Sequence, residues 1–360
     1  KGNIIREFST FLPPDIKMDL KYDKYLTSFD YLLVLDAAKV RKGPGLDEEV
    51  IKTLQKNEKI SLIAEVKGEY LEKWKSDSWY QVAWQEGDEV KTGFVYAPLG
   101  EVRRYQLEKM EEVLKYLKEE SDKGELAYIS NYKDANGRPP LLNGSAWDEF
   151  GYRRSQSAAG YYSPQKGSNF RYIPDGMLVR VLEERDGFTK VNVIGWEGEY
   201  WVQNKYINRK NTLKDLKKVI VIDRKFQNEG VFEFIEGQWT LVSYTLATTG
   251  KKGTYSLETP LGYYMAIQKR DKFLYYEDGT QEIAGYAPYA IRFSGGGYIH
   301  GVPVNYIKEE GSLIDPGMKE YSITMGTVPL SHMCVRNYTS HAKFIYDWVE
   351  IGSSAVVVIE

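Results

Sequence analysis

Alternation of apolar and polar residues dominates the first third of the chain. A period of two is typical of strands that bury one face. An apolar run with turn chemistry at its end, residues 31–45, comes first, and alternating runs follow at residues 58–66, 79–84 and 92–96. Short strands separated by turns predict a small antiparallel β-barrel over residues 31–105.

The same pattern returns more weakly in the middle of the chain. Alternating runs at residues 177–183 and 188–193, with a shorter one at 199–202, predict a second small barrel over residues 155–210. Two sheets of similar pattern approach an internal repeat. Residues 1–30 read as an ordered N-terminal arm.

Helical spacing is found in two places. Residues 105–120 carry apolar side chains three and four positions apart, which predicts an amphipathic helix between domains: Leu107, Met110, Val113, Leu114 and Leu117. Residues 106–154 therefore form a helix and an irregular connector. From residue 217 to residue 360 the strands become longer, a hairpin is predicted at residues 231–250, and a helix follows near residues 337–349.

Composition narrows the class of protein. The 360 residues include 29 tyrosines, 8 tryptophans and 32 glycines, which favours strands and turns. A formal net charge of −3 gives no basic surface for nucleic acid. No apolar stretch is long enough to span a membrane. The chain begins at Lys1 without an apolar leader, so we expect a leader that is removed or lies outside this sequence. We expect a monomer.

Candidate chemistry centres on residues 329–337, which contain the only cysteine, Cys334. A lone thiol is a buried hydrophobe, a nucleophile or a metal ligand. Only three histidines exist, His300, His332 and His341, and their spacing differs from that of structural zinc sites. We expect no metal or organic cofactor, and we expect His341 to be structural.

Two families are recognisable in these motifs. Residues 31–105 resemble a bacterial SH3-like domain through Ala38-Lys39-Val40-Arg41, Trp79-Tyr80-Gln81-Val82 and Gly93-Phe94-Val95. Residues 217–360 resemble an L,D-transpeptidase catalytic domain of the YkuD type. The matching pieces, in order, are the strand hairpin, the T-G-K-x-G turn at residues 249–253, Thr259-Pro260-Leu261-Gly262, Ile299-His300-Gly301 and Ser331-His332-Met333-Cys334-Val335-Arg336. The fold class is then mainly β, two small SH3-like barrels followed by a β-rich catalytic domain with short helices.

The resemblance implies roles for these residues. Cys334 is the nucleophile, His300 its base, the Gly301 carbonyl orients the base, and His332 lies beside the oxyanion pocket. The backbone N–H groups of Met333 and Cys334 are the implied oxyanion donors. Substrate-binding candidates follow as a group: Ser331, Arg336, Tyr298 and Tyr263. We also expect the helix that follows Cys334 to favour its thiolate.

The implied reaction is acyl transfer on peptidoglycan stem peptides outside the cytoplasm. Cys334 forms a thioester, D-alanine is released, and a 3→3 cross-link results; carbapenems are implied acylating agents. Water as the acceptor would make the enzyme an L,D-carboxypeptidase, and a degenerate site would leave a wall-binding protein. Cell-wall cysteine peptidases place cysteine before histidine, unlike this chain, and sortases lack the Thr259 and Ile299 motifs.

Three departures from the family pattern affect these expectations. Met333 replaces the usual glycine, so a positive φ would strain it and its side chain would crowd the acyl pocket. A long insertion, residues 302–330, separates the His300 motif from Ser331 and predicts a loop over the cleft. Val302 replaces a residue that usually carries a hydroxyl.

Overall fold

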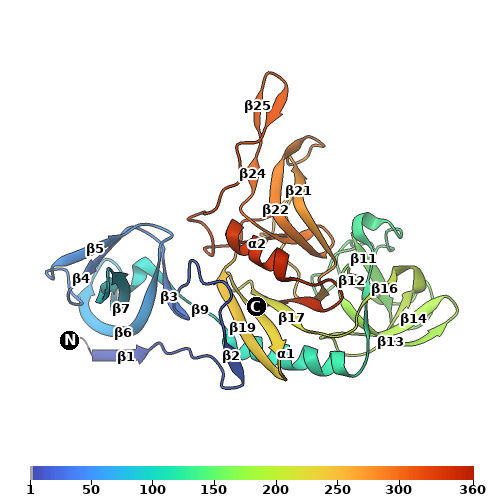
Figure 1. Ribbon diagram of the computed structural model, residues 1–360, viewed down its shortest axis with the longest axis horizontal. Helices are drawn as coiled ribbons and strands as arrows, with labels where there is room; N and C mark the ends of the chain where they lie inside the picture. Colours follow the sequence, from blue (N-terminus) through green and yellow to red (C-terminus); the bar gives the residue numbers. More distant parts are fainter. Residues whose placement is uncertain (1–2) are drawn as a thin grey trace. The chain divides into compact units, whose positions relative to one another are not determined.

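The computed structural model describes residues 3–360 and divides into two compact units. Unit 1 comprises residues up to 14 together with 23–108, and unit 2 comprises residues 15–22 and 109–360. Both consist mainly of strands, so the predicted mainly β class is confirmed (Figure 1). No helix in the described part of the chain has the length and apolarity that crossing a membrane requires.

Unit 1 is built on one antiparallel sheet in the order β5-β4-β8-β7-β6-β3-β9, with β1 added to β6. Its strands are β1 (Asn3–Glu7), β3 (Asp30–Val34), β4 (Ala38–Arg41), β5 (Val50–Leu54), β6 (Lys59–Leu71), β7 (Ser76–Glu86), β8 (Glu89–Tyr96) and β9 (Gly100–Arg104), with the 3₁₀ turn η1 (Ala97–Leu99). The apolar run at residues 31–45 is thus two strands, because the chain turns between Val34 and Ala38. Inward-facing Leu32, Val40 and Val82 form the core.

The second SH3-like sheet lies in unit 2 and begins at residue 126, earlier in the chain than the predicted start at residue 155. The order is β12-β11-β15-β14-β13-β10-β16. Its strands are β10 (Leu126–Ile129), β11 (Ser157–Tyr161), β12 (Phe170–Pro174), β13 (Leu178–Arg185), β14 (Phe188–Val193), β15 (Tyr200–Gln203) and β16 (Ile207–Leu213), with the 3₁₀ turns η2 (Tyr132–Asp134) and η3 (Asn204–Tyr206). Residues 126–129, expected in the irregular connector, are a strand because they pair with both β13 and β16.

The two sheets repeat one topology. Numbering the seven strands of each in chain order, from β3 and from β10, gives the same spatial order, 3-2-6-5-4-1-7, in both. A 3₁₀ turn precedes the last strand in each, η1 in the first and η3 in the second. The weak repeat in the sequence therefore corresponds to a repeated strand order, which supports the prediction of a second SH3-like module.

The remaining strands of unit 2 form the part that carries the motif residues. A six-stranded sheet has the order β2-β19-β18-β17-β28-β20, and a five-stranded sheet has β21-β22-β23-β27 with β24 on β22. The elements are β2 (Ile16–Met18), β17 (Lys218–Asp223), β18 (Asn228–Ile235), β19 (Gln238–Leu246), β20 (Gly262–Met265), β21 (Gln268–Tyr276), β22 (Ile283–Ser294), β23 (Gly297–His300), β24 (Val304–Asn305), β25 (Ile307–Glu309), β26 (Ser312–Ile314), β27 (Val335–Arg336), β28 (Ser354–Ile359), α1 (Leu107–Asp122) and α2 (Thr339–Trp348).

Both predicted helices and the hairpin are confirmed. The first helix is α1, and its apolar positions Leu107, Met110, Leu114 and Leu117 are buried. The predicted hairpin is β18 and β19, joined by Glu236 and Gly237, which both have positive φ as a tight two-residue turn requires. In Figure 1, α1 lies beside β17 and β19.

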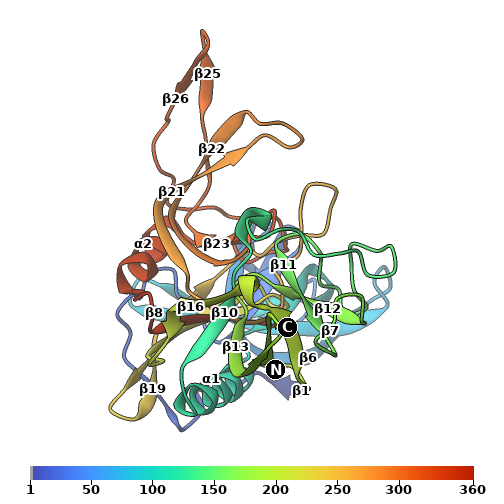
Figure 2. The same ribbon diagram turned by 90° about the vertical axis from the view of Figure 1, so that its right-hand side faces the viewer.

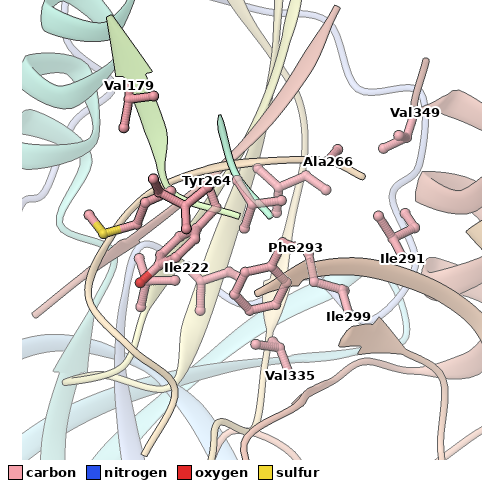
Figure 3. Close-up of a cluster of buried hydrophobic side chains, with 14 of the residues drawn as sticks. Val179, Ile222, Tyr264, Ala266, Ile291, Phe293, Ile299, Val335 and Val349 are labelled. Carbon is pink, nitrogen blue, oxygen red and sulfur yellow. The ribbon is translucent and has the colours of Figure 1, made fainter. Parts of the chain in front are cut away.

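One hydrophobic core joins the second SH3-like sheet to the catalytic strands. Figure 3 shows Val179 of β13 in the same cluster as Ile222 of β17, Tyr264 of β20 and Phe293 of β22. A buried ion pair adds to this contact, with Arg292 Nη1 2.6 Å from Asp175 Oδ2. The shared core explains why residues 155–210 and 217–360, expected as separate domains, belong to one compact unit.

Candidate active site

The nucleophile candidate and the base candidate come from neighbouring strands. β23 and β27 pair in parallel, with Ile299 opposite Val335 and His300 opposite Arg336. Cys334 directly precedes β27. Because side chains alternate along a strand, Cys334, Arg336 and His300 share one face. All three line a cavity of about 1170 Å³ in unit 2.

The environment of Cys334 favours the protonated thiol over the thiolate. The residue is only 8% exposed, and its Sγ donates to the Gly296 carbonyl at 3.5 Å. Burial raises the pKa of Cys334 to about 11, against the smaller opposing effects of the Tyr298 backbone N–H and the Arg336 charge. The expected help from a helix N-terminus is not present, because α2 begins only at Thr339, after β27 has intervened.

The imidazole of His300 is neutral and oriented. Its Nδ1 donates to the Gly301 carbonyl at 2.7 Å, which leaves Nε2 as the proton acceptor. Burial lowers the pKa of His300 to about 4, an effect that the Gly301 hydrogen bond opposes and the Arg336 charge reinforces. The predicted orienting role of Gly301 agrees with this geometry. A neutral imidazole with a free lone pair can remove a proton from a thiol.

Ser331 and His332 hold the loop that carries the thiol. The Ser331 hydroxyl donates to the Cys334 carbonyl and lies 3.4 Å from the Met333 backbone nitrogen. The His332 Nε2 lies 2.9 Å from Asp278 Oδ1, in the turn between β21 and β22, and both side chains are more than half exposed. Sequence reasoning missed Asp278, because nothing in the local pattern links that turn to Ser331.

Met333 has the backbone conformation that favours glycine. Its φ is +144°, so the strain expected from replacing the family glycine is present in the structure. Thr259 of the Thr-Pro motif fixes this conformation, because its Oγ1 donates to the Met333 carbonyl at 2.8 Å. The side chain does not crowd the first cavity, as had been expected, since it lines a second cavity instead.

This conformation allows a stability prediction. Met333→Ala and Met333→Gly both remove the buried side chain, but only glycine relieves the positive φ, which is worth about 1 kcal/mol. We expect the glycine variant to be more stable than the alanine variant by about that amount, the reverse of the usual order. Urea unfolding of the two proteins measures the difference. An alanine variant of higher stability would show that Met333 is unstrained.

The remaining substrate-binding candidates differ in position. Arg336 lines the first cavity, and among residues 3–360 its buried Nε has no hydrogen-bond partner. Tyr298 is buried and does not line the first cavity; it stacks on Phe273, which does, with ring centroids 4.2 Å apart. Tyr263 lines neither cavity, because its ring packs on Tyr116 of α1 at 5.3 Å. The structure therefore does not bring Tyr263 to the site.

Several cavity residues come from segments that carried no motif. Tyr132 and Lys133 of the predicted connector line the first cavity, and so does Gln156 at the start of the predicted second barrel. The Tyr132 hydroxyl lies 3.1 Å from that of Tyr298. The insertion at residues 302–330 contributes a wall: Val302, Pro303, Asn305, Lys319, Tyr321, Ser322, Thr324 and Met325. The length of this insertion was the signal in the sequence that it would form a loop over the cleft, and its position along the cavity agrees with that expectation. Its tip forms the β25–β26 hairpin, which Figure 2 shows projecting from the sheet.

His341 belongs to a buried polar network, as its structural assignment predicts. Its Nε2 lies 2.9 Å from Ser243 Oγ and its Nδ1 lies 2.8 Å from Asn337 Oδ1. Asn337 Nδ2 donates to Glu229 at 3.2 Å, and the Asn337 backbone N–H donates to the His300 carbonyl at 2.8 Å. The network thus supports the strand of the base. Among residues 3–360 no group of three or more metal-binding side chains is arranged around a common point.

The network makes stability depend on pH. Burial raises the pKa of Glu229 to about 8 and lowers that of His341 to about 3. Between pH 4.5 and 6.5, Glu229 and His341 change the free energy of unfolding with pH in opposite directions. From pH 6.5 to 8 only Glu229 contributes, and the folded state holds a proton that the unfolded state has lost. We expect stability to fall there by about 1.4 kcal/mol per pH unit.

The matched variant for this prediction is Glu229→Gln, which keeps a neutral hydrogen-bonding side chain. Urea unfolding of unit 2 at pH 6.5 and pH 8 should show that the free energy of unfolding decreases less in the variant than in the parent protein. Equal losses in the two proteins would mean that Glu229 is ionised in the folded state at pH 6.5.

Comparisons with known proteins agree with this architecture. Residues 217–359 match the family model of the L,D-transpeptidase catalytic domain (YkuD), and residues 36–100 match that of the bacterial SH3 domain. No curated protein matches the chain.

Solved structures give three similar chains. A fused Zn-dependent amidase/peptidase/peptidoglycan-binding protein from Clostridium acetobutylicum is 21% identical, with a TM-score of 0.28 over 40% of this chain and 52% of its own. The L,D-transpeptidase from Mycobacterium smegmatis is 16% identical, with a TM-score of 0.32 over 51% and 82%. L,D-transpeptidase 3 from Mycobacterium tuberculosis is 16% identical, with a TM-score of 0.31 over 57% and 79%. This chain thus spans about half of the first of these.

The domain assignment follows from the family matches together with the order of the motifs along β23, β27 and their connecting loops. Residues 217–359 are an L,D-transpeptidase catalytic domain of the YkuD family, and a bacterial SH3 domain precedes it at residues 36–100.

Proposed function

We propose that this protein is a cysteine-dependent L,D-transpeptidase that acts on peptidoglycan tetrapeptide stems outside the cytoplasm. The observation that carries the proposal is the arrangement of Cys334 and His300 on one face of two paired strands, both lining the large cavity. The YkuD match over the same residues supports the substrate class.

The first half of the reaction forms a thioester. His300 Nε2 takes the proton of the Cys334 thiol as the sulfur attacks the carbonyl carbon between the third stem residue and the terminal D-alanine. The backbone N–H groups of Met333 and Cys334 are the proposed donors to the oxyanion. His300 then returns the proton to the departing amine, the C–N bond breaks, and D-alanine leaves.

The second half resolves the thioester. The side-chain amine of a second stem attacks the thioester carbon and His300 accepts the amine proton. The C–S bond then breaks, His300 passes the proton to the sulfur of Cys334, and the thiol is regenerated with a 3→3 cross-link. The raised pKa of the thiol and the lowered pKa of the imidazole both disfavour a resting thiolate–imidazolium pair. Proton transfer therefore accompanies attack rather than preceding it.

Arg336 is the proposed anchor for a substrate carboxylate. It is partly buried at the cavity that Cys334 also lines, and burial lowers the pKa of Arg336 against the opposing influence of Cys334. A guanidinium with free donors can bind a carboxylate through two hydrogen bonds.

The repeated strand order supports two SH3-like modules, for which we propose peptidoglycan binding or positioning of the catalytic domain.

The test is incubation of the full chain with a disaccharide-tetrapeptide, followed by mass spectrometry of the products. Free D-alanine with a cross-linked dimer establishes the transpeptidase. Free D-alanine with a tripeptide product alone establishes the carboxypeptidase, in which water is the acceptor. Binding without release of D-alanine would contradict both activities and leave the wall-binding protein with an inactive site.

A further inference from the structure

A second cavity of about 380 Å³ in unit 2 adjoins the loop that carries the nucleophile. His332 and Cys334 line the first cavity, whereas Met333 between them lines the second. The turn after β22 also lies between the two cavities, because Gly295 lines the second cavity and Gly296 lines the first. A ligand in the second cavity would therefore lie one residue away from the proposed thioester.

Arg153 is a cation in this cavity that has no carboxylate partner. Its Nη2 lies 3.8 Å from Met333 Sδ, a weak acceptor. Among residues 3–360 no carboxylate forms an ion pair with its guanidinium. Asp134, the acid whose charge acts on it, is paired with Arg138 at 2.8 Å. Burial lowers the pKa of Arg153, so an anionic ligand would relieve an unfavourable environment.

The loop that presents Arg153 is held in place. Trp147 and Arg153 form a backbone bridge, and the buried Asp148 accepts from the backbone N–H groups of Phe150 at 3.0 Å and Tyr152 at 2.9 Å. The cation therefore occupies a defined position before any ligand binds. A preorganised site loses less entropy on binding than a mobile one.

The other lining groups describe the ligand. Lys252 adds positive charge and Glu258 is the one acid among the lining residues, whereas the charge of Arg224 is paired with Glu360, whose Oε2 lies 2.9 Å from the Arg224 Nε. At the rim, Trp147 is 48% exposed and Phe150 is 52% exposed, so their rings offer apolar surface to a bound molecule. The cavity suits a molecule with at least one carboxylate and an adjoining apolar or ring-bearing part.

We propose that the second cavity binds a carboxylate-bearing segment of a peptidoglycan stem peptide, with Arg153 as the carboxylate-binding residue. This identification of the ligand rests on the proposed function. Arg153 would exchange the Met333 thioether for a carboxylate, which can accept two hydrogen bonds from the guanidinium fork. Arg153 lies in the loop between β10 and β11, two strands of the second SH3-like sheet, so this sheet contributes to substrate binding through that loop.

The test is binding without chemistry. Isothermal titration calorimetry uses the full chain with Cys334→Ala and, as probe, the stem tripeptide L-Ala-γ-D-Glu-diaminopimelate with free carboxylates. We expect Arg153→Met, added to this background, to weaken binding about tenfold or more, because a charge-assisted hydrogen bond is lost. Arg153→Lys keeps the charge and should lose less. The exposed Lys166, which lines neither cavity, provides the matched control Lys166→Met.

Amidation of the probe completes the design. If Arg153 binds a carboxylate, Arg153→Met should have little effect on the affinity for the fully amidated tripeptide. An Arg153→Met protein that binds the free tripeptide within twofold of its parent overturns the proposal, and so does an equal loss for both probes. Arg153→Gln serves if the methionine variant fails to fold. Because the readout needs no turnover, a failure to release D-alanine would contradict the proposed reaction and leave this result unaffected.

Discussion

Cys334→Ala should abolish D-alanine release, with a loss of at least about 10⁴-fold in the acylation rate. The reason is that Cys334 is the only thiol of the chain and lies with His300 at the same cavity. Intact-mass spectrometry after incubation with a carbapenem measures the same step, since the parent protein should gain the mass of one acyl adduct and the variant none.

Controls for this result are available within the site. The alanine variant must unfold at the same temperature as the parent protein. We expect this because the substitution makes only a modest change to a buried side chain. An adduct on the alanine variant would place the nucleophile elsewhere and would contradict the proposed mechanism. Failure of both proteins to form an adduct would favour the wall-binding alternative.

His300→Gln should lower the acylation rate by about 10²- to 10⁴-fold, the range that a general base contributes. Glutamine retains a polar side chain of similar size but cannot accept the thiol proton. The matched comparison is His332→Gln, where we expect a smaller loss because that imidazole is more than half exposed and paired with Asp278. A larger loss at His332 would transfer the role of the base to that residue.

The pH dependence of acylation follows from the same residue. The base acts only when neutral, and the pKa of His300 is lowered to about 4. The rate should therefore fall as the pH drops through about 4 and should show no step at the ordinary histidine value near 6.5. Stopped-flow measurement of β-lactam acylation from pH 3.5 to 8 tests this. A step at pH 6.5 would mean that His300 is solvated during the reaction.

Much of the fold could be predicted because its signals are local. The apolar spacing in α1, the alternation in β14 and the continuous apolar run of β17 depend on neighbouring residues alone. β10 was missed for the opposite reason. These four residues between the end of α1 and the turn η2 become a strand only because β13 and β16 lie on both sides of them. The union of the second SH3-like sheet with the catalytic strands likewise depends on a shared core.

For the site, the sequence by itself determined the candidate nucleophile, the candidate base and the order of the motifs. Cys334 is the only cysteine, and the family resemblance of the Ile299-His300-Gly301 motif singles out His300 among three histidines. The sequence also marked Met333 as a position that a positive φ would strain, and the structure supplied the φ of +144°. Only the tertiary structure decided the protonation states of the thiol and the imidazole, because burial by distant segments shifts both pKa values. It alone placed Asp278 beside His332 and Arg153 beside Met333. Such pairings join residues far apart in the chain, and no local pattern encodes which distant segments meet.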